Sequence, residues 1–524
     1  MKLFVSLLAV AAFVLAGCNN DLTKPGASRL FGSNDLILHA HFVGSENLFK
    51  SPDAAKLHEV WNLKSSGDLR NLALDRFSRL PYFWLSNALP KGSADQAALF
   101  RPLFEDVLAR ESYIDWRATP VFGMAVRLPE ARSQAWDKNL RQVLSGWKLG
   151  NPTALNTPGT SGWELSKAGA FSIRFSRAGE WTRLTVGQDA ANAEANVVLG
   201  LKSPRPSGAW LEGDMNLAHF KGRIPWLEYY DNLPTAHFSL SNRADFVRTL
   251  VQLDFPKPHN WKSEPWQIPT NMMSDRIMDF TAVRGVAGVL DALPLMHNTG
   301  WNPMPSQVCG WGNRDLPFQF FYATPAQKVT NRLVAIAPRL RSEVHRTLGS
   351  NVQGSIDWNA ARQELVWSGL PLAVPSLFQG LDGNTEFLTL GLFPLMKSRR
   401  PPPAELFEQL KGRNDLVFYD WESTAFRIPS WWQFYQIAEL GTHRRLSPTN
   451  LVNQRWQIEV ASFMGDSATE LRATSPSQMT LARKSTLGLT SFELVTLSRW
   501  LDSADFPAFG LYPATPPPRG RPVK

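Results

Sequence analysis

The sequence predicts an α+β fold: a duplicated body in which strand-helix-hairpin units form mostly antiparallel sheets with helices packed on one face. Three observations support this. Apolar and polar residues alternate along several segments, as in "AFSIRFSRAGEWTRLTVG" at 170–187, which is the period of a half-buried strand. Other segments, such as "EARSQAWDKNLRQVL" at 130–144, have the period of an amphipathic helix. The same order of elements also recurs along the chain.

The recurring order is strand, helix and hairpin. We expect it four times, near residues 121–187, 209–254, 317–368 and 415–487. In the first of these, the two alternating runs around Ala178 and Gly179 read as a β-hairpin. Because each unit has one apolar sheet face and one helix, neighbouring units can bury each other's faces.

The segment before these units opens with a strand, "LILHAHFV", and continues with helices expected over 51–63, 68–85 and 95–111. At 524 residues, the chain is long enough for two to four domains or one large compound one. We expect an N-terminal α+β half over 35–300 and a C-terminal half over 301–505.

The two ends differ in composition from the body. Lys2 is the only charge before an apolar run, Leu3 to Ala16, which is too short to cross a bilayer as a helix of ~20 residues. This arrangement indicates a signal peptide over 1–17. Residues 18–34 read as a polar leash, and residues 506–524 read as a Pro-rich basic tail without a folded core.

The end of the apolar run, Leu15-Ala16-Gly17-Cys18, resembles a lipobox, the bacterial lipoprotein signal in which the cysteine is acylated and becomes the mature N-terminus. The resemblance implies lipidation at Cys18, attachment to a membrane through the lipid, and a body in the cell envelope. Asn19 follows the cysteine where an Asp would resemble an inner-membrane retention signal, which favours the outer membrane if the host has one. Loosely, the mature chain also resembles large bacterial lipoproteins of unknown function built from duplicated α+β units.

Charge and cysteine content narrow the possible partners. Removal of 1–17 removes one lysine and lowers the net charge from +9 to +8. No run of Lys and Arg with interleaved aromatics indicates nucleic-acid binding. With Cys18 lipidated, Cys309 is the one remaining cysteine of the two in the chain. An intrachain disulfide is then impossible, and Cys309 reads as a small buried hydrophobe.

The motifs that would specify a reaction are absent from the sequence: no Walker loop, dinucleotide fingerprint, GxSxG, HExxH or EF-hand loop occurs. His39 and His41 alternate on one predicted strand and so share a face, as a metal pair does. The other histidines follow no pattern that would complete such a site. We therefore expect neither a metal nor a cofactor.

Asp420 and Glu422 in "FYDWES" also share a strand face, with aromatic neighbours suited to a sugar. Glycosidases use two carboxylates ~5–9 Å apart, so this pair carries an alternative function, hydrolysis of a surface glycan. The local alternative is that the two acids cap a helix or hold a turn at the end of the strand.

The chain is rich in tryptophan, with 20 residues. Exposed indoles stack on sugars or anchor protein partners, whereas buried ones fill corners between layers. Candidates in loop-like contexts are Trp261, Trp266, Trp301, Trp311, Trp431 and Trp432. The sequence thus favours a membrane-anchored, non-catalytic scaffold or binding module for an envelope protein or glycan over an enzyme.

Overall fold

A computed structural model gives the fold of the chain. It describes residues 35–507 apart from short internal gaps at 87–88, 119–120, 168–170, 203–207, 222–226, 228–229, 260–263, 274–275, 293, 315–318, 349–353, 371–372, 394–401, 403–404, 411, 442–450 and 504–505. The predicted signal peptide, Cys18, the predicted leash and residues 508–524 therefore lie outside the described residues.

The described residues form twenty strands in one sheet. In chain order these are β1 (Leu36–Phe42), β2 (Ser112–Arg117), β3 (Val121–Arg127), β4 (Thr153–Ala154), β5 (Ser161–Lys167), β6 (Phe171–Ala178), β7 (Trp181–Gly187), β8 (Ala209–Asn216), β9 (Thr235–Arg243), β10 (Phe246–Asp254), β11 (Ile277–Arg284), β12 (Gln307–Asn313), β13 (Phe320–Pro325), β14 (Ser355–Asn359), β15 (Glu364–Ser368), β16 (Ser376–Asp382), β17 (Thr385–Gly391), β18 (Leu416–Ser423), β19 (Asp466–Ser475) and β20 (Gln478–Ser485).

Each recorded strand pair is antiparallel. Read from one edge to the other, the order is β4-β5-β6-β7-β3-β2-β1-β8-β9-β10-β20-β19-β18-β11-β12-β13-β17-β16-β15-β14. The predicted combination of helices with a large antiparallel sheet is confirmed. So is the hairpin of β6 and β7, which turns at Gly179 with a positive φ of 60°, a conformation that glycine adopts without strain.

The strand order divides into two equal halves. Adding ten to each strand number converts the order of β1 to β10 into that of β11 to β20, and the halves meet where β10 pairs with β20. The duplication is thus twofold, where the sequence predicted four similar units. The third predicted unit, near 317–368, ends before β16 and β17, which are the equivalents of the β6–β7 hairpin. The second half begins with β11 at residue 277, so the predicted boundary at 300/301 falls after its first strand.

The helices lie between these strands. They are α2 (Ser45–Leu48), η3 (Pro52–Ala54), α3 (Ala55–Trp61), α4 (Lys64–Leu85), α5 (Ala97–Ala109), α6 (Glu130–Gly146), α7 (Ala190–Lys202), η4 (Leu217–Phe220), η6 (Thr270–Met272), α8 (Ala287–Ala292), α9 (Pro294–Thr299), α10 (Val329–Leu348), α11 (Glu405–Glu408), α12 (Thr424–Gly441), α13 (Val452–Ala461) and α14 (Ser491–Asp502).

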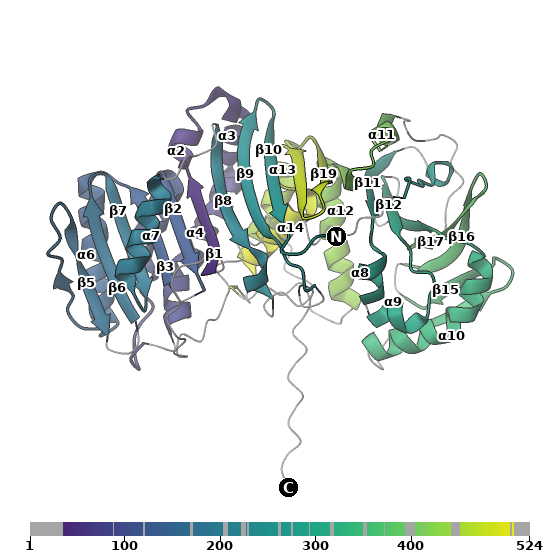
Figure 1. Cartoon of the computed structure of the whole chain (residues 1–524), viewed down its shortest axis with the longest axis horizontal. Coiled ribbons are helices and arrows are strands. Elements are labelled where there is room, and N and C mark those ends of the chain that lie inside the picture. The colour runs from purple at the N-terminus through teal and green to yellow at the C-terminus, as the bar shows by residue number, and fades with distance from the viewer. Residues whose placement is uncertain are drawn as a thin grey trace, which may run out of the picture.

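Helices cover both faces of the sheet, which corrects the prediction of helices on one face. Along β3, Val126 packs with Trp136 and Leu140 of α6. The neighbouring residue Ala125 packs with Val197 of α7. Since successive strand residues point to opposite faces, α6 and α7 lie on opposite sides of the sheet, and α7 lies in front of β2 and β3 (Figure 1).

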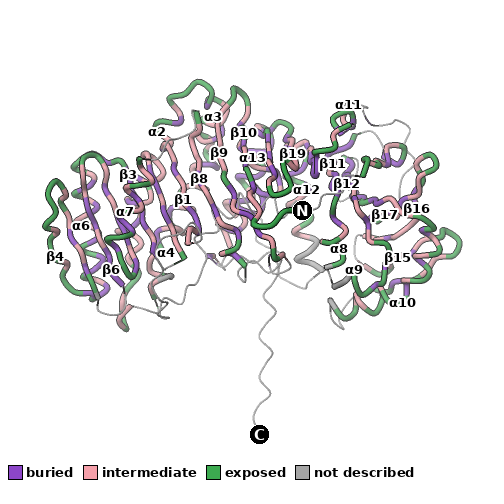
Figure 2. Tube along the Cα trace, in the orientation of Figure 1, coloured by how far each residue is buried: buried purple, intermediate pink, exposed green. Residues whose placement is uncertain are grey.

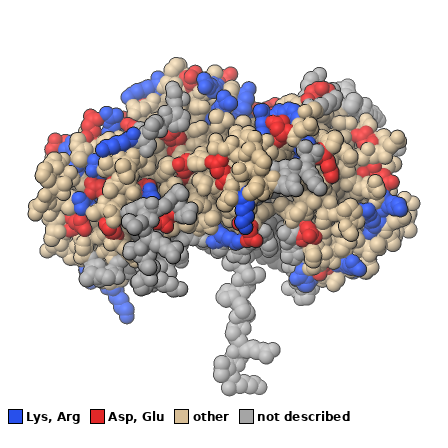
Figure 3. All heavy atoms as spheres, viewed as in Figure 1, with Lys and Arg blue, Asp and Glu red and all other residues tan. Residues whose placement is uncertain are grey.

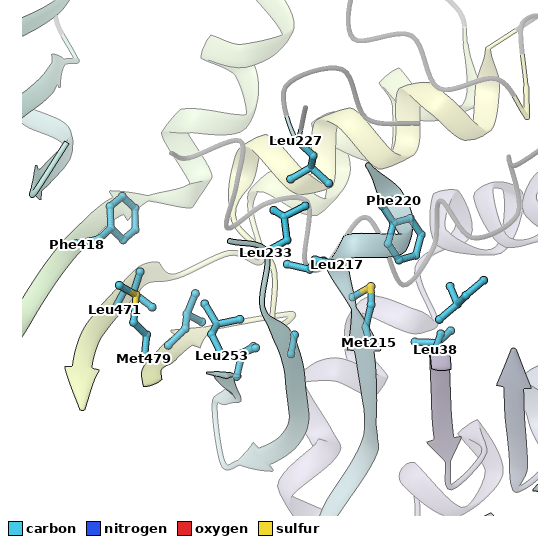
Figure 4. Packing of buried hydrophobic residues seen from close by; sticks show 14 of the residues in the cluster. Leu38, Met215, Leu217, Phe220, Leu227, Leu233, Leu253, Phe418, Leu471 and Met479 are labelled. Carbon is cyan, nitrogen blue, oxygen red and sulfur yellow. The ribbon is translucent and has the colours of Figure 1, made fainter. Parts of the chain in front are cut away.

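Among the described residues, helices cover β8, β9 and β10 on one side of the sheet. Met215, Ala236, Leu253 and Met479 lie opposite one another on β8, β9, β10 and β20 and share one core (Figure 4). That core also takes in Trp500 of α14. We call the other side of β1, β8, β9 and β10 the open face. Figure 1 shows no helix in front of it.

The end of the described chain is packed rather than extended. Phe506 lies 4.7 Å from Trp500 and 5.9 Å from Phe77, measured between ring centroids. Trp500 Nε1 also donates to the carbonyl of Pro507 at 3.2 Å. Residues 506 and 507, which were predicted to belong to the tail, are therefore part of the packed body.

Candidate functional site

The two acids of the hydrolase hypothesis, Asp420 and Glu422, are buried in β18, with 3% and 1% of their surface exposed. Thr281 donates to Asp420 Oδ1 at 2.5 Å. Glu422 accepts hydrogen bonds from the Ser491 backbone N–H at 2.6 Å and from the Ser491 hydroxyl at 2.7 Å. Ser491 is the first residue of α14, where a carboxylate is stabilised by free N–H groups and the helix dipole. The sequence left open a local role, in which these acids cap the next helix or hold a turn. Glu422 instead lies at the N-terminus of α14, 69 residues further along the chain, and Asp420 bonds to Thr281 of β11.

Two buried ion pairs surround these acids. Arg427 of α12 contacts Asp279 at 2.5 Å, and Arg483 of β20 contacts Glu493 of α14 at 2.7 Å. All four side chains are at most 4% exposed. Buried ion pairs bring little net stability, but removal of one partner is costly because it leaves the other charge in a dry interior. The cluster therefore fixes how α12 and α14 pack on the sheet and exposes no carboxylate to a substrate.

The open face carries a different polar set. His39 of β1 contacts Asp214 of β8 at 3.1 Å. Asp214 accepts from Nδ1 of His237 on β9 at 2.5 Å, and Nε2 of His237 contacts Asp254 of β10 at 2.9 Å. We call these four residues the open-face ladder. Their side chains are 28–43% exposed. Figure 3 shows acidic side chains on the surface over this part of the sheet.

Beside the ladder, His41 lies deeper. Its Nε2 is 3.1 Å from Glu111, and its Nδ1 is 3.5 Å from Glu212 of β8. The shared face of His39 and His41 is confirmed, because both reach acids of the same strand, β8. Within the described parts of the chain, no group of three or more His, Cys, Asp or Glu is arranged to hold a metal ion.

Ionisation follows from these contacts. Burial opposes the charge of Asp214, but hydrogen bonds from His237 and His39 outweigh it and hold the pKa of Asp214 well below its ordinary value. The hydrogen bond to Asp214 raises the pKa of His237 above its ordinary value of 6.5, against a smaller effect of burial. Burial likewise opposes the charge of Asp254, yet hydrogen bonds from Gln478 and Gln252 and the charge of His237 lower its pKa.

Two of the six tryptophans predicted to bind a partner lie in the interior. Trp301 is 4% and Trp311 is 2% exposed, so these two belong to the core. Trp266 is half-buried and covers the guanidinium of Arg284. Large apolar rings fill the seams between sheet and loops, which explains these positions.

The remaining tryptophan candidates lie on α12 or outside the described residues. Trp431 packs against Phe434 and Phe492, and Trp432 is half-buried. Trp261 falls in the gap at 260–263.

Cys309 is fully buried in β12, and burial raises the pKa of its thiol to about 12. A thiol with so high a pKa is unreactive at neutral pH. Among the described residues, none of the helices combines the length and hydrophobicity that a bilayer-spanning helix needs.

Sequence reasoning missed His237, Asp214 and Asp254. They come from three strands, and the contacts between them depend on the register of β8, β9 and β10. The one signal in the sequence is that Asp214 and Glu212 alternate on a strand, as His39 and His41 do.

Comparison with known proteins adds little. No protein-family model matches the chain, and no curated protein matches it. Two solved structures, crystal forms I and III of TP0453, are similar to it at 9% identity with a TM-score of 0.24. They cover 44% and 46% of this chain, and 78% and 80% of their own. So low a TM-score carries no argument about function.

Proposed function

We propose that the chain is an envelope lipoprotein, anchored through Cys18, that serves as a non-catalytic scaffold and binds a protein or glycan partner on the open face of its sheet. One observation carries this proposal. The middle of a twenty-stranded sheet is packed with helices on one side, while the other side presents the partly exposed open-face ladder.

The chemistry of the open face suits a polar partner. Gln252 and His237 are exposed there, and Ser239 is half-buried. Figure 2 shows intermediate burial along much of β8 and β9. These side chains offer donors and acceptors in register on neighbouring strands. Protein loops and sugar hydroxyls both bind through such groups, which also keep the open face soluble when no partner is bound.

Hydrolysis of a glycan lacks comparable support. A catalytic acid and base must reach the bond that they cleave. Asp420 and Glu422 are instead buried, and their hydrogen bonds run to Thr281, Ser491 and Thr424.

The experiment is a binding assay with the secreted body, Asn19 to Lys524, immobilised and exposed to an envelope extract of its host at low and moderate salt. Gln252→Arg places a long cation on the open face. Gln134→Arg is the matched control, because Gln134 is exposed on the helix side, on α6.

We expect a partner that survives moderate salt and is lost at least tenfold with Q252R but retained with Q134R. Equal retention by both variants would place the partner elsewhere. Retention only at low salt would reduce the interaction to generic attraction by the +8 charge.

The anchor is tested separately. Cys18→Ser removes the acylated thiol, so we expect the full-length protein to leave the membrane fraction and appear in the soluble fraction. Membrane pelleting of C18S that is unchanged after carbonate washing would contradict the lipid anchor.

A further inference from the structure

His237 is bonded through both nitrogens of its ring. Nδ1 lies 2.5 Å from Asp214 Oδ1 on β8, and Nε2 lies 2.9 Å from Asp254 Oδ2 on β10. A neutral imidazole has one N–H, so it can donate to one carboxylate only. Both contacts are hydrogen bonds only when His237 carries two ring protons. The geometry therefore selects the imidazolium form.

The strands are already joined by backbone pairing, since β9 lies between β8 and β10. The side-chain bridge adds a link at one end of these strands, because Asp254 is the last residue of β10 and pairs with Thr235, the first residue of β9. Strand ends open more readily than strand centres. A charge-assisted bridge at this position therefore has a local effect.

We propose that His237 is a pH-sensitive clamp between β8 and β10 on the open face. While protonated, it holds Asp214 and Asp254 together. Once it loses a proton, one hydrogen bond is lost and the two carboxylates face a neutral ring. The open-face ladder then loses one positive charge as the proton passes to solvent, and the end of β10 loosens.

The strands and helices around β9 carry other charged groups. On the open face these are His39, His41 and Glu212 of β1 and β8, Asp115 of β2, and Arg248 and Lys484 of β10 and β20. The short helices η3 and η4, which also contact β9, contribute Asp53 and His219, and Arg243 ends β9. The nearest of these groups is His39, which shares Asp214 with His237. The charged groups that raise the pKa of His237 are its two partners, Asp214 and Asp254.

The direct test is an NMR titration of the full body, Asn19 to Lys524, with histidine rings labelled at Cε1. The chain has nine histidines, and the His237 signal is identified as the one missing in His237→Gln. Should H237Q not fold, Asp254→Asn identifies the signal instead, because the half-exposed Asp254 side chain tolerates replacement. Asp357→Asn is the matched control, because Asp357 lies on β14, the edge strand of the second half of the sheet.

We expect a titration midpoint for His237 above 6.5 that moves down in D254N and stays unchanged in D357N. A midpoint at or below 6.5, or one that D254N leaves in place, would overturn the clamp. This outcome would leave the binding proposal standing, because retention of a partner is measured independently.

A second measurement reads the local opening. Amide hydrogen exchange of the β9 and β10 ends is compared at about pH 6 and about pH 9, after correction for the intrinsic rates. We expect protection to fall at the higher pH in the wild type and to be low at both pH values in D254N. If D254N leaves the protection unchanged, the bridge through His237 does not stabilise the ends of β9 and β10.

Discussion

Strands β8 and β18 hold equivalent places in the two halves, and each carries two acids separated by one residue: Glu212 and Asp214, Asp420 and Glu422. The two pairs point to opposite sides of the sheet. Asp214 lies beside His237 on the open face, whereas Asp420 lies on the same side as Leu253 and the helices. Equal spacing on equivalent strands thus leads to different chemistry.

The carboxylates of Asp214 and Glu422 are stabilised in different ways. On the open face, histidines and water share the charge of Asp214, which is 28% exposed. On the helix side, Glu422 is 1% exposed and depends on the N-terminus of α14 and hydroxyl groups. Substitution of Glu212 or Asp214 should therefore have a small effect on stability that depends on pH. Substitution of Asp420 or Glu422 should lower the free energy of unfolding by more.

The largest expected effect is at Arg483. Arg483→Met leaves the fully buried Glu493 without its cation, and such a loss costs about 3–5 kcal/mol. Lys484→Met is the matched control, because Lys484 is the next residue and is exposed on the opposite face. Urea unfolding should show a large fall in midpoint for R483M and little change for K484M. Similar urea midpoints for R483M and K484M would mean that water reaches Glu493 and compensates for the loss of Arg483.

The second effect compares the acid pairs directly. Glu422→Gln keeps the shape but removes the charge that faces the Ser491 N–H, and a charge-assisted hydrogen bond is worth about 1.5–3 kcal/mol. Glu212→Gln on β8 changes a side chain that is 13% exposed and lies 3.5 Å from His41. Thermal unfolding should show the larger fall for E422Q. An equal fall in the two variants would remove the distinction between the faces.

The third effect is smaller and depends on pH. The pKa of Asp214 is lowered, so the stability that this group contributes is present above its unfolded value of 3.8 and is lost as the pH falls through the folded value. Partial exposure limits that contribution to about 1 kcal/mol. Asp214→Asn should therefore lower the melting temperature at neutral pH, and the difference from wild type should shrink as the solution is acidified below 3.8. A difference that is constant with pH would mean that the charge of Asp214 contributes nothing.

Much of the architecture was predictable because it depends on local periodicity. The alternation around Gly179 predicted the β6–β7 hairpin, and helical periodicity predicted α6. The side taken by α7 was not predictable. Its residues are apolar enough to cover the sheet, but they do not indicate which side. The side is known only from the folded structure, where Val197 of α7 packs against Ala125 of β3, which faces away from α6.

The site was harder to predict than the fold. Asp420 and Glu422 do share a strand face, yet nothing in "FYDWES" tells which side of the sheet α14 will cover. Burial of Trp301 and Trp311 likewise depends on how strands from distant segments meet, since Trp311 stacks on Phe321 of the neighbouring strand. Their loop-like, Gly- and Pro-rich sequence context left burial and exposure both open.

Joining the halves through β10 and β20 leaves two sheet edges, where two separate ten-stranded sheets would have four. Unpaired edges expose N–H and C=O groups that recruit other strands and so promote aggregation. The two remaining edges are short: β4 has two residues and β14 has five. Within the described residues, the terminal strands of this very long antiparallel sheet therefore offer few backbone groups for unwanted strand addition.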